Sequence, residues 1–243
     1  MNSGIDQRLA EVRGRMAEAA RKAARKPEEI ELVAVSKAHG PEALHEALDA
    51  GQTLFGENRV QEARAKMPLV SSRARWHFIG HMQKNKVRQA LPVFEMLQSI
   101  DSLELAREVQ RIADEDAQRP RVLLEVNVAG EGSKFGFKPA TLEADLETLI
   151  ASMPRLDVLG LMAIPPFSAK PEDSRPYFAA LRELRDGLQT KLRVGLPELS
   201  MGMSGDYEIA IEEGATMVRV GTAIFGERKG KAWKPAPEAP GDY

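Results

Sequence analysis

The feature that most constrains the fold of this chain is a regular alternation between short apolar runs and amphipathic segments. The runs are rich in Val, Ile and Leu, and they cover residues 31–37, 52–57, 75–80, 94–100, 121–128, 156–164, 198–204 and 217–226. Segments with helix-like periodicity lie between them, at 41–51, 60–67, 85–93, 102–117, 141–153, 174–192 and 206–215. Several runs are apolar at successive positions, which indicates strands buried on both faces, as in a parallel sheet covered by helices.

Eight strand–helix units in 243 residues predict an α/β protein with a single-domain (β/α)8 TIM barrel, whose typical length is about 250 residues. The alternative is a doubly wound open sheet. That fold usually has fewer strands, and its dinucleotide-binding form carries a glycine-rich loop after the first strand. The first run here ends in VSKAHG (35–40), which contains no such loop, so we favour the barrel.

An extra helix is expected before the first strand and a tail after the last. The helical period appears at Ile5, Leu9, Val12, Met16 and Ala19, and Pro27 ends the pattern. We expect the barrel over residues 1–230. Residues 231–243 carry three prolines in the final nine positions, which predicts a disordered tail.

Composition excludes several classes of protein. The absence of cysteine excludes a disulfide scaffold, thiolate metal sites and a cysteine nucleophile. The 34 basic and 36 acidic residues nearly balance, so no nucleic-acid partner is expected. No apolar run approaches the roughly 20 residues of a membrane span, and no signal sequence is recognisable at the N-terminus. We therefore expect a cytoplasmic protein with no membrane partner.

The site of such a barrel lies at the carboxyl ends of its strands, where Lys37 stands out. Lys37 follows Val33 and Val35 at a period of two and so shares their face. If that face is the barrel interior, the amine lies at the barrel mouth over an apolar wall. Desolvation there favours the neutral, nucleophilic amine that Schiff-base chemistry requires. The alternative is a lysine at a strand end that extends into solvent.

A second candidate is an anion-binding site formed by residues 200–206 (SMGMSGD) together with Gly221 and Thr222. Glycine-rich turns before helices present free N–H groups to anions, and barrels frequently bind phosphate through the loops after strands seven and eight. Helix capping by Ser204 or Asp206 is the alternative. Both interpretations stay open on these residues alone.

Other polar residues in the strands have two possible roles. Arg219 lies on the same face of its strand as Gly221, where it could face a cofactor ring or form an ion pair at the barrel bottom. His77 and His81 are four apart on a strand, about 13 Å, which is too far to share one metal. The loop 130–137 (GEGSKFGF) contains Lys134 and is either a mobile arm over the mouth or a plain surface loop.

Several motifs in order resemble the YggS/PROSC family of pyridoxal phosphate homeostasis proteins. They are ELVAVSK, LFGENRVQEA, WHFIGHMQKNK, GSKFGF, LGLMAI and LSMGMSGDYEIAIEEGATMVRVGTAIFG, which together cover roughly residues 5 to 228. The resemblance implies a barrel like the N-terminal domain of alanine racemase. It also implies pyridoxal 5′-phosphate (PLP) bound to Lys37 as a Schiff base.

The resemblance extends to further cofactor contacts. Ser200, Ser204, Gly221 and Thr222 would hold the phosphate, Arg219 would face the pyridine nitrogen, and Asn58 would lie near the ring. Met201, His77 and Lys134 are further, less defined candidates.

The function itself stays open among three alternatives. Arginine cannot accept the proton of a pyridinium, so Arg219 weakens the electron sink that PLP enzymes use. The racemases also take a catalytic tyrosine from a second domain, for which this sequence shows no counterpart. We therefore favour a monomeric carrier that stores PLP, delivers it to apo-enzymes transiently and affects amino-acid and keto-acid balance. A weak PLP-dependent amino-acid racemase is the alternative, and a phosphometabolite-binding barrel is a third.

Overall fold

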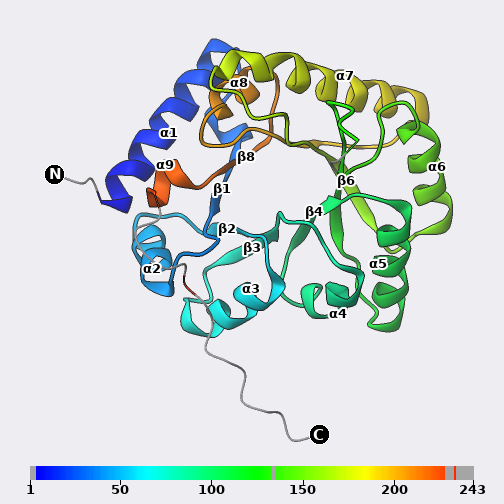
Figure 1. The fold of residues 1–243 in the computed structure, drawn as a ribbon, viewed down its shortest axis with the longest axis horizontal. Coiled ribbons are helices and arrows are strands. Elements are labelled where there is room, and N and C mark those ends of the chain that lie inside the picture. The colour runs from blue at the N-terminus through cyan, green and yellow to red at the C-terminus, as the bar shows by residue number, and fades with distance from the viewer. Residues whose placement is uncertain (1–3, 133–134, 228–232, 234–243) are drawn as a thin grey trace, which may run out of the picture.

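Eight parallel strands form a closed barrel in the computed structural model, which describes residues 4–132, 135–227 and 233 (Figure 1). The strands are β1 (Glu31–Val35), β2 (Leu54–Glu57), β3 (Arg75–Phe78), β4 (Met96–Ile100), β5 (Arg121–Glu125), β6 (Asp157–Met162), β7 (Glu198–Ser200) and β8 (Met217–Val220). Each pairs with the next in parallel, and β8 pairs with β1. The predicted (β/α)8 fold is confirmed.

A ring of helices surrounds the barrel. The helices are α1 (Ile5–Lys22), α2 (Pro41–Asp49), α3 (Val60–Lys66), α4 (Val87–Ala90), α5 (Leu103–Glu115), α6 (Leu142–Ser152), α7 (Arg175–Leu192), α8 (Tyr207–Glu212) and α9 (Thr222–Phe225). Single 3-10 turns precede β1, follow α3 and precede α4 and α7, at Pro27–Glu29, Met67–Leu69, Lys84–Lys86 and Pro171–Ser174. Among the described residues, no helix is both long enough and apolar enough to cross a membrane.

The last two strands are shorter than the sequence predicts. The run 217–226 leaves the sheet at Gly221, whose φ of −114° and ψ of −78° are not those of a strand, and the residues after it form α9. The run 198–204 leaves it after Ser200, before Gly202 with a φ of +90°. A side chain at position 202 would also lie 2.5 Å from the Cβ of Ala210, so glycine is required there.

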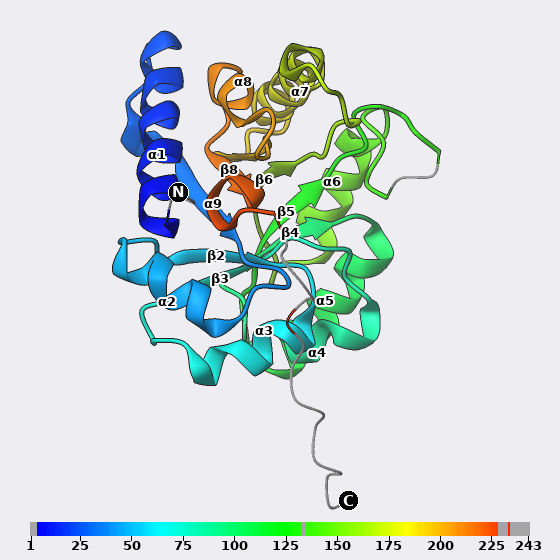
Figure 2. The same ribbon diagram turned by 60° about the vertical axis from the view of Figure 1, so that its left-hand side comes forward.

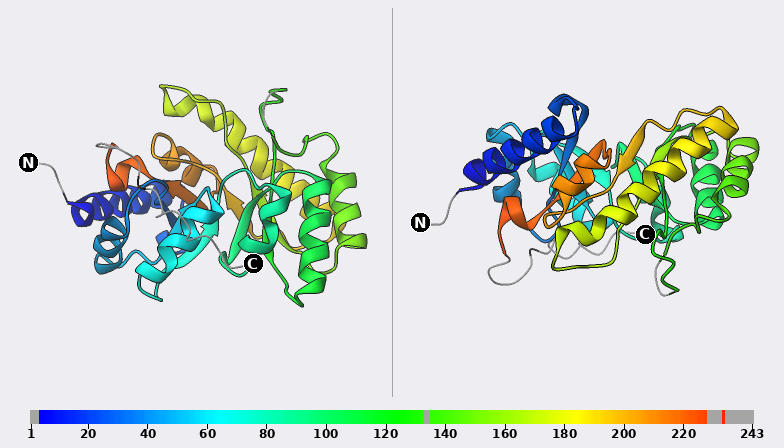
Figure 3. Two further views of the ribbon diagram at one scale, coloured as in Figure 1. Left: turned by 60° about the horizontal axis from the view of Figure 1, so that its bottom comes forward. Right: turned by 90° about the horizontal axis from the view of Figure 1, so that it is seen from above.

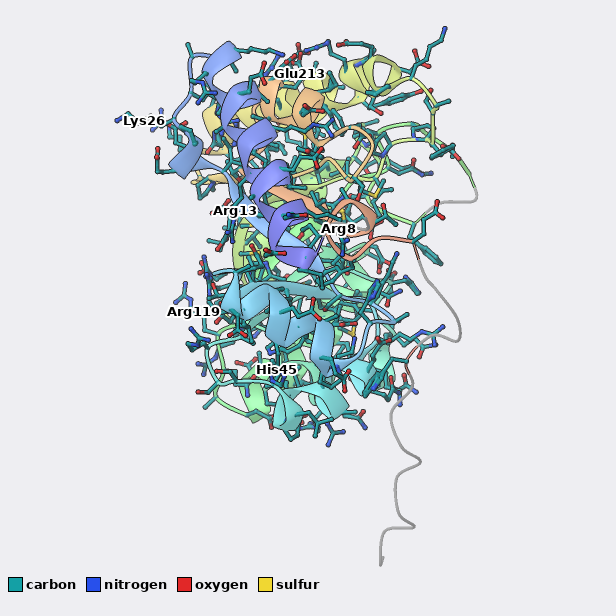
Figure 4. The ribbon with its side chains drawn as sticks, turned by 90° about the vertical axis from the view of Figure 1, so that its left-hand side faces the viewer. Arg8, Arg13, Lys26, His45, Arg119 and Glu213 are labelled. Carbon is teal, nitrogen blue, oxygen red and sulfur yellow. The ribbon has the colours of Figure 1, made fainter. Side chains whose placement is uncertain are left out.

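The extra N-terminal helix is confirmed as α1, and it closes the ring between α8 and α2 (Figures 1 and 2). The five residues that set its predicted period are all buried. Arg15 forms an ion pair with Glu208 of α8 at 2.6 Å. Figure 3 shows α8 lying between the two longest helices, α1 and α7. On the other side of α1, Arg13 donates to the carbonyl of Ala50, the residue after α2, at 2.9 Å (Figure 4).

The core has two parts, because successive strand residues point to opposite faces. The outer part fills the space between barrel and helices. The inner part occupies the barrel interior with an apolar cluster, Val33, Leu54, Met96, Leu123, Met162 and Met217. Polar side chains, Gln98, Ser200 and Arg219 among them, occupy the rest of the interior and are buried. The polar part of the interior therefore needs hydrogen-bond partners of its own.

Candidate functional site

A cavity of about 350 Å³ opens at the carboxyl ends of β1 and β8 and the loop after β7. Five residues that the sequence predicts for the site line it: Lys37, Ser204, Arg219, Gly221 and Thr222. They meet because β1 is hydrogen-bonded to β8, with Val33 opposite Arg219 in the register. Two steps further along each strand, Val35 packs against Gly221. The sheet order thus brings together residues that lie almost 190 positions apart in the chain.

Lys37 enters this cavity from the end of β1 on the face predicted from Val33 and Val35. Val35 and Ile79 provide an apolar wall beside it. The lysine itself is exposed, however, so the desolvation expected of its amine is not found. An exposed amine at a cavity mouth remains accessible to an incoming carbonyl compound.

The loop after β7 and the start of α9 form a small hydrogen-bonded unit on the opposite side of the cavity. Ser204 Oγ accepts from the backbone N–H groups of Gly221 at 3.1 Å and Ala223 at 3.4 Å. Asp206 holds the same loop, accepting from the Met203 N–H at 2.7 Å and from Ser174 Oγ at 2.9 Å. Ser204 therefore contacts the first turn of a helix, and it does so on the cavity wall.

Arg219 reaches the cavity from the barrel interior and is 3% exposed. Its Nη1 donates to Ser200 Oγ at 2.5 Å and its Nη2 donates to the Ala163 carbonyl at 3.0 Å. Desolvation by burial lowers the pKa of Arg219 to about 10, while Glu125 and Asp206 oppose this shift. The guanidinium remains protonated near pH 7, so it can only donate hydrogen bonds toward the cavity.

A chain of neutral side chains continues from Arg219 through the barrel interior. Because Ser200 Oγ accepts from arginine, its own proton is given to Gln98 Oε1 at 2.7 Å. The Gln98 amide nitrogen therefore faces His77 Nδ1, at 2.8 Å, and donates to it. Burial lowers the pKa of His77 to about 3, which keeps the ring neutral with its proton on Nε2. All the hydrogen bonds in this chain run in one direction, from Arg219 to His77.

The remaining predicted residues lie elsewhere. Ser200 and His77 belong to the interior chain rather than to the cavity wall. Met201 is wholly buried in the hydrophobic layer outside the barrel. Asn58 lines a neighbouring cavity of about 300 Å³ together with His81. The backbone of Asn58 packs closely against Gly80, and a side chain at position 80 would clash with it. Lys134 lies outside the described residues.

His81 is not part of a histidine pair with His77. It is exposed at the surface, where it forms a hydrogen bond with Asp101 at 2.9 Å and stacks on Phe135 with ring centroids 3.8 Å apart. Among the residues that sequence reasoning missed, Gln98 is the most important for the site. Its signal was a single amide inside the apolar run 94–100, in phase with the barrel interior.

Comparison with known proteins places this geometry in a family. Residues 8–229 match the sequence profile of the alanine racemase N-terminal domain. The pyridoxal phosphate homeostasis protein of Aquifex aeolicus is 46% identical over 224 residues, which cover 92% of this chain and 98% of the relative. The Escherichia coli protein of the same name is 41% identical over 92% of this chain and 97% of its own length. The chain belongs to the family of pyridoxal phosphate homeostasis proteins.

Solved structures agree with this family membership. PipY of Synechococcus elongatus, solved with PLP bound, has 38% identity and a TM-score of 0.80, and the match covers 91% of this chain and all of PipY. The resemblance drawn from the sequence motifs is therefore confirmed. An alanine racemase from Clostridium difficile, at 15% identity and a TM-score of 0.70, shares the fold, and the match covers 57% of its length. This homeostasis-protein barrel thus corresponds in fold to part of the racemase.

Proposed function

We propose that this chain binds PLP through Lys37 and holds it as a reservoir that supplies PLP to other proteins. The observation that carries the proposal is that one cavity brings together a reachable primary amine, a guanidinium that only donates, and the Ser204–Gly221 loop. Family membership and the PLP bound to PipY support the same ligand. Binding of a free aldehyde by a covalent bond to lysine is a reversible form of storage.

The residues present fit PLP in size and chemistry. A volume of about 350 Å³ lies at the lower end of the range of about 300–1,000 Å³ usual for small-molecule pockets. The Ser204 hydroxyl lies at the first turn of α9, where its oxygen accepts from the N–H groups of Gly221 and Ala223 and its own proton is left to donate to a phosphate oxygen. Val35 and Ile79 provide an apolar surface for an aromatic ring.

The bound cofactor would supply an aldehyde, which condenses with the Lys37 amine to form a C=N bond and release water. Lys37 provides the amine. Because its side chain is exposed, an aldehyde bound to it would be accessible to water or to another protein. Arg219 is held at the cavity by its bonds to Ser200 and the Ala163 carbonyl and has no acceptor atom, so a ring nitrogen facing it would accept a hydrogen bond and stay unprotonated. Ser204 and the first turn of α9 orient the phosphate.

The cavity favours a carrier over a racemase. Racemisation needs a base on each face of the substrate, and Lys37 could serve as only one of them. Among the described residues that line the cavity, the one carboxylate, Asp206, is already occupied by Met203 N–H and Ser174 Oγ, and tyrosine is absent. An unprotonated ring nitrogen would also weaken carbanion stabilisation. We therefore propose binding without efficient turnover, in a cytoplasmic monomer.

A spectral titration with PLP, followed by mixing with an apo-enzyme, tests the proposal. We expect a Schiff-base absorbance band in the wild-type protein, no such band in Lys37→Ala, and recovery of the apo-enzyme's activity from the loaded protein. The Lys191→Ala variant is the matched control, because Lys191 is exposed on α7, far from the cavity, and pairs with Glu143. A band that survives Lys37→Ala would overturn the assignment. Exchange of an amino-acid α-proton in D₂O at catalytic rates would favour the racemase.

The domain bounds, the partners and the oligomeric state are part of the same proposal. We place the barrel at residues 1–230 and the tail at 231–243, with apo-enzymes that need PLP as transient partners. Light scattering tests the monomer directly.

A further inference from the structure

A buried ionic cluster lies behind the segment that carries Lys37, between the barrel and α3. Ser36 and Glu57 point outward from the ends of β1 and β2, and Glu62 and Lys66 lie one turn apart on α3. Lys66 and Glu57 have fully buried side chains, and the Glu62 side chain is 9% exposed.

All three protons of the Lys66 ammonium have partners in this cluster. The Nζ atom donates to Glu57 Oε1 at 2.7 Å, to Glu62 Oε1 at 2.7 Å and to the carbonyl of Ser36 at 2.9 Å. Glu62 Oε1 also accepts from the backbone N–H of Ala38 at 2.5 Å. The Ser36 carbonyl and the Ala38 N–H belong to the two peptide groups on either side of Lys37. The cluster therefore forms hydrogen bonds with both peptide groups of the lysine.

The backbone at this point needs support. Ala38 has a φ of +66°, a left-handed conformation that is unfavourable for a residue with a Cβ. Two further hydrogen bonds hold the turn: His39 N–H donates to the Ser36 carbonyl at 3.0 Å, and Trp233 N–H donates to the Ala38 carbonyl at 3.1 Å. The Trp233 ring covers Lys66, with its centroid 5.3 Å from Nζ.

Burial of these charges is poorly explained by stability alone. A buried ion pair often contributes no more than apolar residues of the same volume would, because desolvation offsets the attraction. Desolvation also raises the pKa of the Glu57 carboxyl, although Lys66 opposes this, and Glu57 Oε2 has no hydrogen-bond partner among the described residues. The cluster gains little stability, but it fixes the two peptide groups beside a reactive amine. Its role is therefore to hold the backbone in place.

We propose that Glu62 and Lys66 are positioning residues for Lys37, fixing the backbone on both sides of it so that its side chain enters the cavity. This inference rests on the proposed function, because the side chain is positioned for PLP. The residues act through the backbone and would not touch the ligand.

Two Glu62 variants and one distant control test the proposal. Glu62→Ala removes the acceptor for Ala38 N–H, whereas Glu62→Gln keeps an oxygen in its place. Gln52→Ala is the control, because Gln52 bridges β1 and β2 at their opposite ends, donating to the carbonyls of Leu32 at 2.8 Å and Leu54 at 2.7 Å. It weakens the same two strands without touching the peptide groups of Lys37.

We expect Glu62→Ala to raise the dissociation constant for PLP at least about tenfold, Glu62→Gln to raise it about threefold or less, and Gln52→Ala to leave it within about twofold. Without PLP, hydrogen exchange at the Ala38 amide should accelerate in Glu62→Ala and stay slow in Gln52→Ala. Equal PLP affinity and equal exchange in Glu62→Ala and wild type would overturn the proposal.

Two further results are distinguishable. If Glu62→Ala does not fold, Glu62→Asp, which retracts the carboxylate by one methylene, takes its place with the same expectations for affinity and exchange. If the wild-type protein itself does not bind PLP, the proposed function fails, while the exchange rate of the Ala38 amide still tests whether Glu62 holds the turn.

Discussion

The two cations that face the cavity are supported by opposite kinds of surroundings. Behind Arg219 lie neutral groups in the barrel interior, Ser200, Gln98 and His77, joined by hydrogen bonds. Behind Lys37 lie charged groups outside the barrel, Glu57, Glu62 and Lys66. In the first region the functional side chain itself is held. In the second region only the backbone on each side of the functional residue is held.

This difference corresponds to what each cation would do. Arg219 would keep a fixed direction toward a ring nitrogen, so its guanidinium is buried and its Nη1 and Nη2 atoms each have an acceptor. Lys37 would form and break a covalent bond, so its side chain is exposed while its peptide groups are fixed. A carrier that must also release its ligand benefits when the backbone of the lysine is fixed and its side chain stays exposed.

The largest effect is expected from Lys66→Met, which breaks the region behind Lys37. Removal of the ammonium leaves two buried carboxylates without their counterion, so we expect a loss of about 3–5 kcal/mol in the free energy of unfolding. Urea denaturation measures it. Lys22→Met, at an exposed position on α1, should change stability by less than about 0.5 kcal/mol. Similar losses in the two variants would mean that the cluster carries no charge that needs pairing.

The next effect concerns the region behind Arg219. Gln98→Leu leaves the Ser200 hydroxyl proton and His77 Nδ1 without partners, which should destabilise the protein by about 1–3 kcal/mol in total. PLP affinity should fall as well, because Ser200 can then turn away from Arg219. Gln110→Leu on α5 serves as control: it loses hydrogen bonds to Asp114 and Arg155, but titration with PLP should show unchanged affinity. Unchanged PLP affinity in Gln98→Leu would show that the hydrogen bonds of the barrel interior do not affect binding in the cavity.

The third prediction uses the neutrality of the interior chain. Because the pKa of His77 is about 3 in the folded protein and 6.5 in the unfolded chain, the unfolded state binds the proton first as the pH falls. This contribution to stability is complete above pH 6.5 and is lost toward pH 3, about 2 kcal/mol of it by pH 5. Unfolding free energies at pH 7.5 and 5 should therefore differ less in His77→Asn than in wild type. His45→Asn, at an exposed histidine on α2 (Figure 4), should show the same difference as the wild type. If His77→Asn also shows the wild-type difference, His77 is not held neutral by the barrel interior.

The smallest effect is expected from Trp233→Leu, which removes the aromatic ring over Lys66. Such contacts contribute about 0.5–1 kcal/mol at accessible sites and somewhat more when desolvated. Thermal unfolding should show this loss, and Trp233→Phe should recover part of it. A loss equal to that of Lys66→Met would show that Trp233 supports the cluster by more than its ring.

Most of the fold and half of the site could be predicted from the sequence, for a common physical reason. Apolar runs and helical periods repeat along the chain, and a closed parallel barrel then dictates that β1 meets β8. Lys37 and Gly221 become neighbours without any further information. The ends of β7 and β8 were misplaced because Gly202 and Gly221 leave the strand conformation inside continuous apolar runs.

The supporting residues could not be predicted in the same way. Whether Gln98 faces Ser200 or a helix depends on the register of β4 against β5, which is irregular between Leu97 and Ile100. Lys66 and Glu62 have the spacing of an ordinary surface ion pair on a helix, and nothing in the sequence shows that α3 turns this face inward onto Ser36 and Glu57. The sequence therefore predicts which residues meet where a strand end decides their position, and it does not where side-chain packing decides it.

Reductive trapping shows directly whether Lys37 is the residue that binds PLP. The protein is mixed with PLP, treated with sodium borohydride to reduce any C=N bond, digested and analysed by mass spectrometry. We predict one modified residue, Lys37, and no modification of Lys66, whose ammonium is buried with all three protons engaged. Modification of another lysine with Lys37 unmodified, or no modification at all, would contradict this prediction.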